Sequence, residues 1–239
     1  RLSVSNIRRV ELEDLLGRES VSLDDAGLHE LLTGRVVMVS GAGGSIGSEL
    51  CRQIAKFAPS RLVLFESSEF SLYRIDEELA QSFPGVVISA WAGDVRDTER
   101  VEEVLTAEKP AVIFHAAAYK HVPLMEHGNA WQAVRTNALG TLTLARAAQA
   151  AGVDKFVLIS TDKAVNPTNV MGASKRLAER LCRAQQATAG TRFVTVRFGN
   201  VLGSNGSVIP KFREQIARGG PVTVTHPDIV RYFMTIPEA

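Results

Sequence analysis

The chain of 239 residues is 45% hydrophobic and 22% charged, which is sufficient for one α/β domain with a small appended lobe. Its net charge of +1 gives no electrostatic basis for a nucleic-acid partner. The two cysteines and five histidines have no metal-ligand spacing, so we expect neither a metal site nor a disulfide framework. No apolar run approaches the roughly 18 residues that a membrane-spanning helix requires.

Residues 1–34 contain two short helical patterns, at 12–16 and 24–32, which we expect to form an N-terminal extension on the outside of the domain. The chain starts at Arg1 and stops just after Pro237, a residue that favours the first turn of a helix. This pattern predicts a piece of a longer protein, in which a membrane anchor would lie outside the sequence given.

From residue 36 onward, strand-like and helix-like patterns alternate, which is typical of a parallel sheet with helices on both faces. The predicted strands are residues 36–39, 62–65, 86–90, 111–115, 156–160 and 193–198. The predicted helices are residues 48–57, 69–83, 98–107, 130–151, 172–187 and 209–217. Right-handed crossovers would wind this order into a doubly wound, Rossmann-type α/β domain over residues 35–198.

The alternation ends after residue 198. Residues 199–207 are polar and rich in glycine, and residues 222–226 are predicted to form an extra strand. Ligands of doubly wound sheets bind beyond the carboxyl ends of the strands, where late insertions of this kind build a substrate lobe. Residues 199–239 are therefore predicted to be part of a substrate-binding lobe.

A glycine-rich turn follows the first strand directly and leads into the first helix of the sheet domain. Gly41 allows the backbone to reverse, Gly44 lets a pyrophosphate lie against bare main chain, and Gly47 lets the helix pack close to the strand. The N–H groups of the first helical turn would face the phosphates, and Ser45 and Ile46 of the glycine turn are assigned to the same cofactor site. This order of strand, turn and helix predicts a dinucleotide site.

Glu66 ends the second apolar run, about 20 residues beyond the turn, where the ribose-binding acid of this motif lies. A carboxylate there accepts hydrogen bonds from both ribose hydroxyls and repels a 2′-phosphate, so NAD is the expected cofactor rather than NADP. The alternative, that Glu66 only caps the next helix, stays open.

The chain resembles the extended short-chain dehydrogenase/reductase family. The resemblance is carried by the glycine turn at residues 41–47 together with four further features: Gly93-Asp-Val95, His115-Ala-Ala-Ala118, Asn137 and Lys175. More narrowly, the chain resembles the membrane-anchored UDP-N-acetylglucosamine 4,6-dehydratases of bacterial surface-polysaccharide synthesis. That likeness is carried by four stretches, residues 118–123, 160–167, 198–203 and 231–237. The resemblance implies a cofactor set beyond the glycine turn: Asp94, Val95, Ala116, Ala117, Ala118, Asn137 and Lys175.

Thr161, Asp162 and Lys163 end a predicted core strand, so their side chains should emerge where the nicotinamide would sit. Asp162 is predicted to protonate a leaving hydroxyl, and Lys163, with its pKa lowered by partial burial or a nearby cation, to take a proton from an acidic carbon. The alternative is a solvated surface ion pair.

Met171 departs from the superfamily pattern, which has Tyr four residues before the lysine to remove a hydroxyl proton. Because the chain has Met171 at this position, two options follow. Either the enzyme is inactive, or another group or a water relay removes the proton in place of the tyrosine. The resemblance favours the second option, because the membrane-anchored dehydratases resemble this chain in having Met at the position of Met171. The soluble relatives that invert C5 keep Tyr at that position. Lys175 would still hold the nicotinamide ribose.

Lys120 and Arg231 are candidates for gripping a substrate diphosphate, and Asn200, Val208 and Lys211 for contacting the nucleotide base. By resemblance, the expected activity is dehydration of UDP-N-acetylglucosamine at C4 and C6, with NAD recycled and the C5 configuration retained. The resemblance also implies a homo-oligomer and a cytoplasmic domain at the inner face of a bacterial inner membrane. Two other functions stay open, a UDP-sugar 4-epimerase and a catalytically silent dinucleotide-binding sensor or scaffold.

Overall fold

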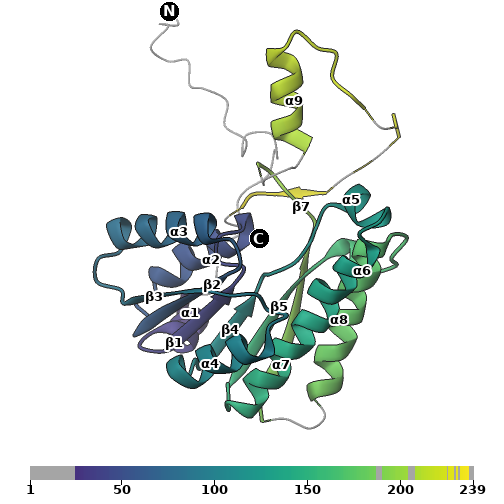
Figure 1. Ribbon diagram of the computed structural model, residues 1–239. Coiled ribbons are helices and arrows are strands. Elements are labelled where there is room, and N and C mark those ends of the chain that lie inside the picture. Colours follow the sequence, from purple (N-terminus) through teal and green to yellow (C-terminus); the bar gives the residue numbers. More distant parts are fainter. Residues whose placement is uncertain are drawn as a thin grey trace, which may run out of the picture. The chain divides into compact units, whose positions relative to one another are not determined.

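The structure, a computed structural model, describes residues 25–186, 190–203, 208–224, 226–228, 230 and 232–236. The chain divides into two compact units, one spanning Asp24–Phe198 and the other including Gly199–Ala239 (Figure 1). The helical pattern expected at 12–16 lies outside the described residues.

A six-stranded parallel sheet forms the centre of the first unit, with the strand order β3-β2-β1-β4-β5-β6. The strands are β1 (Val36–Ser40), β2 (Arg61–Glu66), β3 (Ile88–Ala92), β4 (Val112–His115), β5 (Lys155–Thr161) and β6 (Arg192–Phe198). The chain winds outward from β1 in one direction and then from β4 in the other, which confirms the predicted doubly wound fold. Ligands of such sheets bind at this reversal, beyond the carboxyl ends of the strands.

Helices cover both faces of the sheet. The α-helices of this unit are α1 (Asp25–Leu32), α2 (Ser45–Ala55), α3 (Glu69–Ser82), α4 (Thr98–Glu108), α5 (Val122–Glu126), α6 (Ala130–Ala133), α7 (Thr141–Ala150) and α8 (Val170–Gln186). Side chains alternate along β1: Met38 packs in a core with α4, α7 and α8, whereas Val37 and Val39 pack in a core with α1, α2 and α3. Because both faces are covered, the central strands β1, β2, β4 and β5 are mainly continuous apolar runs.

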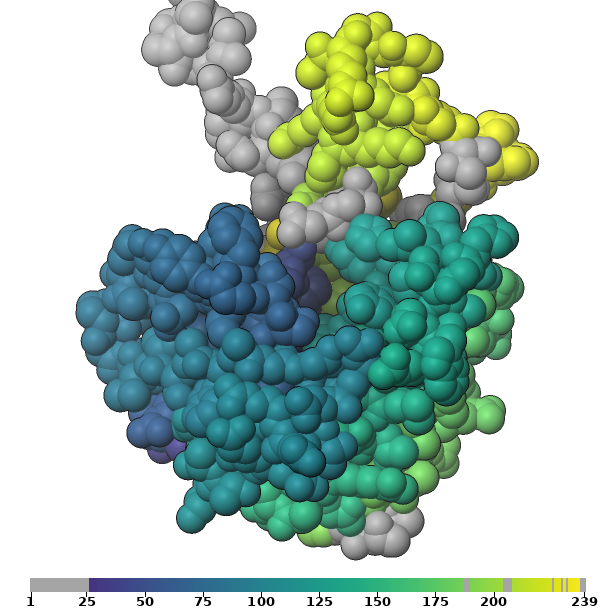
Figure 2. Space-filling model, in the orientation of Figure 1, coloured from purple at the N-terminus to yellow at the C-terminus, as the bar shows by residue number. Residues whose placement is uncertain are grey.

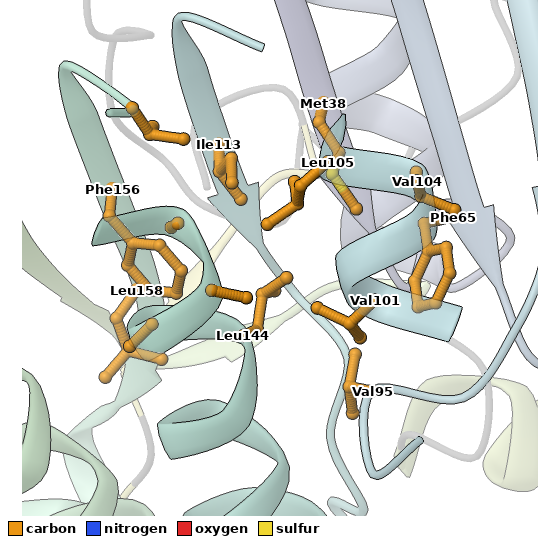
Figure 3. Packing of buried hydrophobic residues seen from close by; sticks show 14 of the residues in the cluster. Met38, Phe65, Val95, Val101, Val104, Leu105, Ile113, Leu144, Phe156 and Leu158 are labelled. Atoms are coloured by element: carbon orange, nitrogen blue, oxygen red, sulfur yellow. The ribbon is translucent and has the colours of Figure 1, made fainter. Parts of the chain in front are cut away.

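The larger core lies between the sheet and α4, α7 and α8. Figure 3 shows Met38, Phe65 and Ile113 of three neighbouring strands gathered around Leu105 of α4 and Leu144 of α7. In the space-filling view, the surface is hollowed between the blue and teal segments, with purple residues from the start of the sheet at the floor (Figure 2).

The predicted helix at 130–151 is one continuous helical stretch, but its middle is a π-helix, η3 (Val134–Gly140), between α6 and α7. Such insertions occur frequently at functional sites. The short helix α5 and the 3₁₀ turn η4 (Asp162–Ala164) were also not predicted. Strand β3 starts at Ile88 and not at residue 86, because residues 84–86 form a turn around Gly85.

The second unit contains α9 (Val208–Ala217) and two short parallel strands, β7 (Asn200–Val201) and β8 (Phe233–Met234). The strand predicted at 222–226 is wrong for the residues described there. Val222 and Val224 are exposed, and no strand of the described part of this unit pairs with them, so their β-branched side chains alone do not produce a strand.

Candidate active site

The ends of β1, β4 and β5 meet at one edge of the sheet. Ser40, the last residue of β1, pairs with His115, the last residue of β4, and His115 pairs in turn with Leu158 of β5. The glycine turn, the segment that starts at Ala116 and the turn that starts at Thr161 therefore follow neighbouring strands at this edge.

The glycine turn lies against the backbone that follows β4. Gly41 has a φ of +71°, and a Cβ added to it would lie 2.6 Å from the amide nitrogen of Ala117. A Cβ on Gly47 would lie 1.9 Å from the carbonyl oxygen of Gly41, so the start of α2 touches the turn itself. Gly44 is the N-cap of α2, no side chain caps this helix, and no acidic residue occupies its first turn. This bare, positively polarised helix end suits a diphosphate group.

Glu66 joins the glycine turn to the start of α3. One carboxylate oxygen accepts a hydrogen bond from the N–H of Gly43 at 3.0 Å, and the other accepts one from the N–H of Ser68 at 3.0 Å. The N-cap of α3 is Ser68, so capping this helix does not depend on Glu66. Gly43, which the sequence analysis did not assign, is needed because a Cβ there would lie 2.4 Å from the Cβ of Ser71.

Asp94 lies in the loop after β3 and accepts hydrogen bonds from the backbone N–H and the guanidinium of Arg96. These bonds hold the pKa of the Asp94 carboxyl below its usual value. The neighbouring Val95 is 4% exposed and packs in the larger core. The side chain of Val95 therefore also contributes to the core, and its predicted cofactor contact stays a prediction.

Asn137 was predicted to contact the cofactor, but the structure gives its side chain a positioning role. It is fully buried in η3, and its Oδ1 accepts a hydrogen bond from the N–H of Tyr119 at 2.8 Å. Its Nδ2 donates to the carbonyl of Tyr119 and to the hydroxyl of Ser174, both at 2.9 Å. Both amide hydrogens are therefore used within the protein, which ties the segment after β4 to α8.

His115 forms a buried polar chain that the sequence analysis missed. Its Nε2 lies 2.8 Å from the hydroxyl of Thr141, which itself donates to the carbonyl of Asn137, so Nε2 must be the protonated nitrogen. Its Nδ1 then accepts from the hydroxyl of Ser40 at 2.6 Å. Burial lowers the pKa of His115 to about 3, so the ring is neutral. A histidine at the end of an apolar strand was the available signal.

Lys175 and Met171 occupy successive turns of α8, as their spacing requires. The Nζ of Lys175 is buried and donates to the carbonyl of Ile159 at 2.6 Å, and burial lowers the pKa of this ammonium to about 8. Met171 is 4% exposed and packs with Met125 and Ala133 in a small apolar cluster.

Thr161, Asp162 and Lys163 form one hydrogen-bonded turn at the end of β5. A carboxylate oxygen of Asp162 lies 2.9 Å from the hydroxyl of Thr161 and 3.0 Å from the Nζ of Lys163. Burial opposes ionisation of Asp162, but these bonds outweigh it and lower the pKa of the carboxyl. The carboxyl is therefore ionised at neutral pH, whereas the general acid predicted from the sequence must carry a proton.

Glu179 anchors α8 to the sheet and was not singled out in the sequence. Its carboxylate accepts hydrogen bonds from Ser160 of β5 at 2.6 Å and from the guanidinium groups of Arg197 and Arg176. Burial alone would raise its pKa, but these bonds outweigh burial and lower the pKa to about 2. An acidic residue on an otherwise buried helix face was the available signal.

The residues predicted to bind substrate belong to both units. Lys120, after β4, reaches solvent, and the atoms packed around it lower its pKa by desolvation. Asn200 donates to the carbonyl of Tyr232 within the second unit, and Val208 and Lys211 lie on α9 of that unit. Arg231 lies outside the described residues.

The part of the chain that the structure describes contains no group of three or more His, Cys, Asp or Glu side chains that could hold a metal ion. None of its helices is both long and apolar enough to cross a membrane.

Comparison with known proteins identifies the family. The family described as "Polysaccharide biosynthesis protein" matches residues 37–239. The chain belongs to this family. It is 53% identical over 240 residues to the capsular polysaccharide biosynthesis protein CapD of Staphylococcus aureus, covering 100% of this chain and 40% of that protein. The chain therefore spans less than half the length of this relative.

Two further relatives carry enzyme names. A UDP-N-acetylglucosamine 4,6-dehydratase (inverting) of Campylobacter jejuni is 32% identical over 213 residues, which cover 86% of this chain and 61% of that protein. A UDP-glucose 4-epimerase of Rickettsia canadensis is 36% identical over 211 residues, which cover 84% of this chain and 59% of that protein.

Solved structures share the fold of this family member. Pen from Bacillus thuringiensis has a TM-score of 0.80 and 36% identity, covering 87% of this chain and 65% of that one. The dTDP-glucose 4,6-dehydratase DesIV of Streptomyces venezuelae, solved with NAD bound, has a TM-score of 0.74 and 25% identity, covering 84% of this chain and 68% of that one.

Proposed function

We propose that this chain is the catalytic part of an NAD-dependent lyase that removes water from C4 and C6 of UDP-N-acetylglucosamine for surface-polysaccharide synthesis. The observation that carries the proposal is the turn formed by Thr161, Asp162 and Lys163, which places a hydroxyl, a carboxylate and an amine together at the sheet edge where a dinucleotide would bind. The named relatives and the solved dehydratase support the reaction class.

The residues present fit NAD. The diphosphate would lie on the bare N-terminus of α2, because the cradle formed by Gly41 and Gly44 leaves main chain exposed to it. Glu66 would accept hydrogen bonds from the adenosine ribose, and Lys175 would donate to the nicotinamide ribose. When bound, NAD would supply a hydride acceptor for C4 and later return the hydride to C6.

The protein's own groups would move the protons. Ionised Asp162 would take the C4 hydroxyl proton through Thr161, whose hydroxyl lies 2.9 Å from the carboxylate, and this replaces the missing tyrosine. The protonated Asp162 would then give that proton to the C6 hydroxyl, which leaves as water. Once Asp162 is neutralised and the ion pair is broken, Lys163 would pass its ammonium proton to water and, as a neutral amine, remove the C5 proton. It would return that proton to C5 when C6 accepts the hydride, and would then regain a proton from water.

Product analysis tests this function directly. Full-length protein incubated with UDP-N-acetylglucosamine is expected to yield a product lighter by the mass of one water molecule, detected by mass spectrometry. Deuterium incorporation at C5 in heavy water, with the configuration retained, would support the expected stereochemistry. An unchanged mass with a new diastereomer would instead establish a 4-epimerase.

The 4-epimerase is the second candidate, because an epimerase is among the relatives. A 4-epimerase has no leaving hydroxyl to protonate, so the Asp162–Lys163 pair favours the dehydratase. Met171 is the support for a silent sensor or scaffold, whereas Asp162, Lys163 and Lys175 argue against it. By resemblance to the membrane-anchored group, we also propose a homo-oligomer whose catalytic domain lies at the cytoplasmic face of the membrane.

A further inference from the structure

We propose that Glu126 is a positioning residue that fixes the segment carrying Lys120 to the start of α8. It would thereby set the distance between Lys120, the proposed substrate-binding lysine, and the turn formed by Thr161, Asp162 and Lys163, here called the catalytic turn. The proposal rests on the dehydratase function for its kinetic consequences, but the contact itself belongs to the fold.

Glu126 makes a hydrogen bond that joins two elements far apart in the sequence. It is the last residue of α5, and its Oε1 accepts a hydrogen bond from the N–H of Val170 at 2.7 Å. Val170 is the first residue of α8, where backbone N–H groups have no partner within the helix. The helix dipole also favours a negative charge at this end. Glu126 therefore satisfies one N–H group at the N-terminus of α8 from another element, while the side chain of Asn169 accepts a hydrogen bond from the N–H of Gly172.

Apolar contacts support this hydrogen bond. Met125, the neighbour of Glu126, is 5% exposed and packs with Met171 and Ala133, and Val122 and Val170 border the same cluster. Because the cluster limits access of water, a broken Glu126–Val170 bond would not be replaced fully by hydration. Met171 thus contributes to the attachment of α5 and need not take part in proton transfer.

The other end of the segment is tied to the same helix. The backbone N–H and carbonyl of Tyr119 both bond to the side chain of Asn137, which also donates to Ser174 of α8. Residues 119–126 are therefore held to α8 at both ends, and Lys120 lies between the two attachments.

The start of α8 also touches the catalytic turn. A Cβ on Gly172 would lie 2.4 Å from the carbonyl oxygen of Lys163, so helix and turn are in direct backbone contact. Any shift of α5 relative to α8 therefore changes where Lys120 lies relative to Lys163. Loss of Glu126 should weaken substrate binding more than it slows the chemical step.

Three variants of the full-length protein test this inference. In Glu126→Ala, we expect KM for UDP-N-acetylglucosamine to rise by about tenfold, with a smaller change in kcat and unchanged NAD occupancy. Glu126→Gln keeps an acceptor oxygen and should restore KM to within about twofold of the parent. The matched control is Glu102→Ala, which removes an exposed carboxylate of α4 and should leave the kinetics unchanged.

Hydrogen exchange of the Val170 amide separates this inference from the proposed function. Protection should fall in Glu126→Ala and persist in Glu126→Gln, whether or not UDP-N-acetylglucosamine is turned over. Parent-level protection and KM in Glu126→Ala would overturn the inference, as would equal rises in KM for both Glu126 variants with Val170 still protected. If the parent protein has no activity, the proposed function fails, and the exchange result alone decides whether Glu126 holds α5 to α8.

Discussion

The carboxyl group of Asp162 decides which proton transfers the site can perform. It is hydrogen-bonded to Thr161 and Lys163 and has a lowered pKa, so it starts as a base. In the proposed path, this carboxylate would first accept the C4 proton and later donate it at C6, so it would serve both as base and as acid. That path would account for Met171 at the position where the superfamily pattern predicts a tyrosine.

Asp162→Asn should lower kcat by about 10²–10⁴, the range typical for loss of a general acid or base, because the amide can neither accept nor return the proton. Steady-state rates measured together with cofactor occupancy would separate chemistry from binding. Asn keeps the shape and can still accept from Thr161, so a near-normal rate in this variant would contradict the proposed proton path.

Met171→Tyr should give little or no gain in activity. Met171 is 4% exposed among Met125 and Ala133, so the larger ring would crowd this cluster and bury a hydroxyl. Initial rates of the parent, of Met171→Tyr and of the size-matched control Met171→Leu provide the measurement. A large rate increase confined to the tyrosine variant would show that the site lacks only its phenol.

At the scale of elements, the site depends on contacts between neighbouring turns. Glu66, at the end of β2, bonds to the glycine turn after β1 and to the start of α3, so one carboxylate aligns two helix N-termini. In a similar way, the side chain of Asn137 bonds to Tyr119 in the segment after β4 and to Ser174 in α8, so one amide holds these two segments together. The π-helix η3 carries Asn137 at a buried position from which it reaches both.

Replacing Glu66 by Ser should move the cofactor preference toward NADP, because the carboxylate would no longer repel a 2′-phosphate. Fluorescence titrations of the parent and of Glu66→Ser with NAD and NADP give the ratio of dissociation constants. Glu66→Gln is the matched control, since it keeps the size and the acceptor oxygen but removes the charge. A parent protein that prefers NADP would refute the assignment of Glu66.

For the whole molecule, the ion-paired cluster around Glu179 links α8 to β5 and to β6, the last strand of the sheet order. The folded-state pKa of Glu179 is about 2, below its ordinary value of 4.5. A carboxyl with a depressed folded-state pKa contributes stability that is fully present above the ordinary pKa. That contribution is lost as the pH falls through the folded-state value.

The free energy of unfolding should therefore decrease as pH falls from about 4.5 toward about 2, in part because Glu179 takes up a proton. Glu179→Gln should be less stable by about 2 kcal/mol at neutral pH and should show a flatter dependence over the acid range. Urea unfolding at several pH values is the measurement. Parallel pH profiles for the two proteins would show that Glu179 does not carry this dependence.

The sequence by itself determined the doubly wound sheet and the glycine turn. Apolar strands alternating with helices admit few topologies, and the steric demands at Gly41 and Gly47 are local, so both features follow from residues close in the chain. It also placed Thr161, Asp162 and Lys163 at a strand end, because that position depends only on the length of an apolar run.

Only the tertiary structure decided what the side chains do at that edge. Asn137 meets Tyr119 and Ser174, and Glu126 meets Val170, because these contacts join segments that the sequence separates by many residues. Asp162 is ionised because the side chains of its neighbours Thr161 and Lys163 turn toward it, and a sequence pattern does not specify side-chain orientation. For the residues described in 222–226, the expected strand was wrong for a similar reason: a strand requires a partner, and the pattern of one segment does not contain its partner.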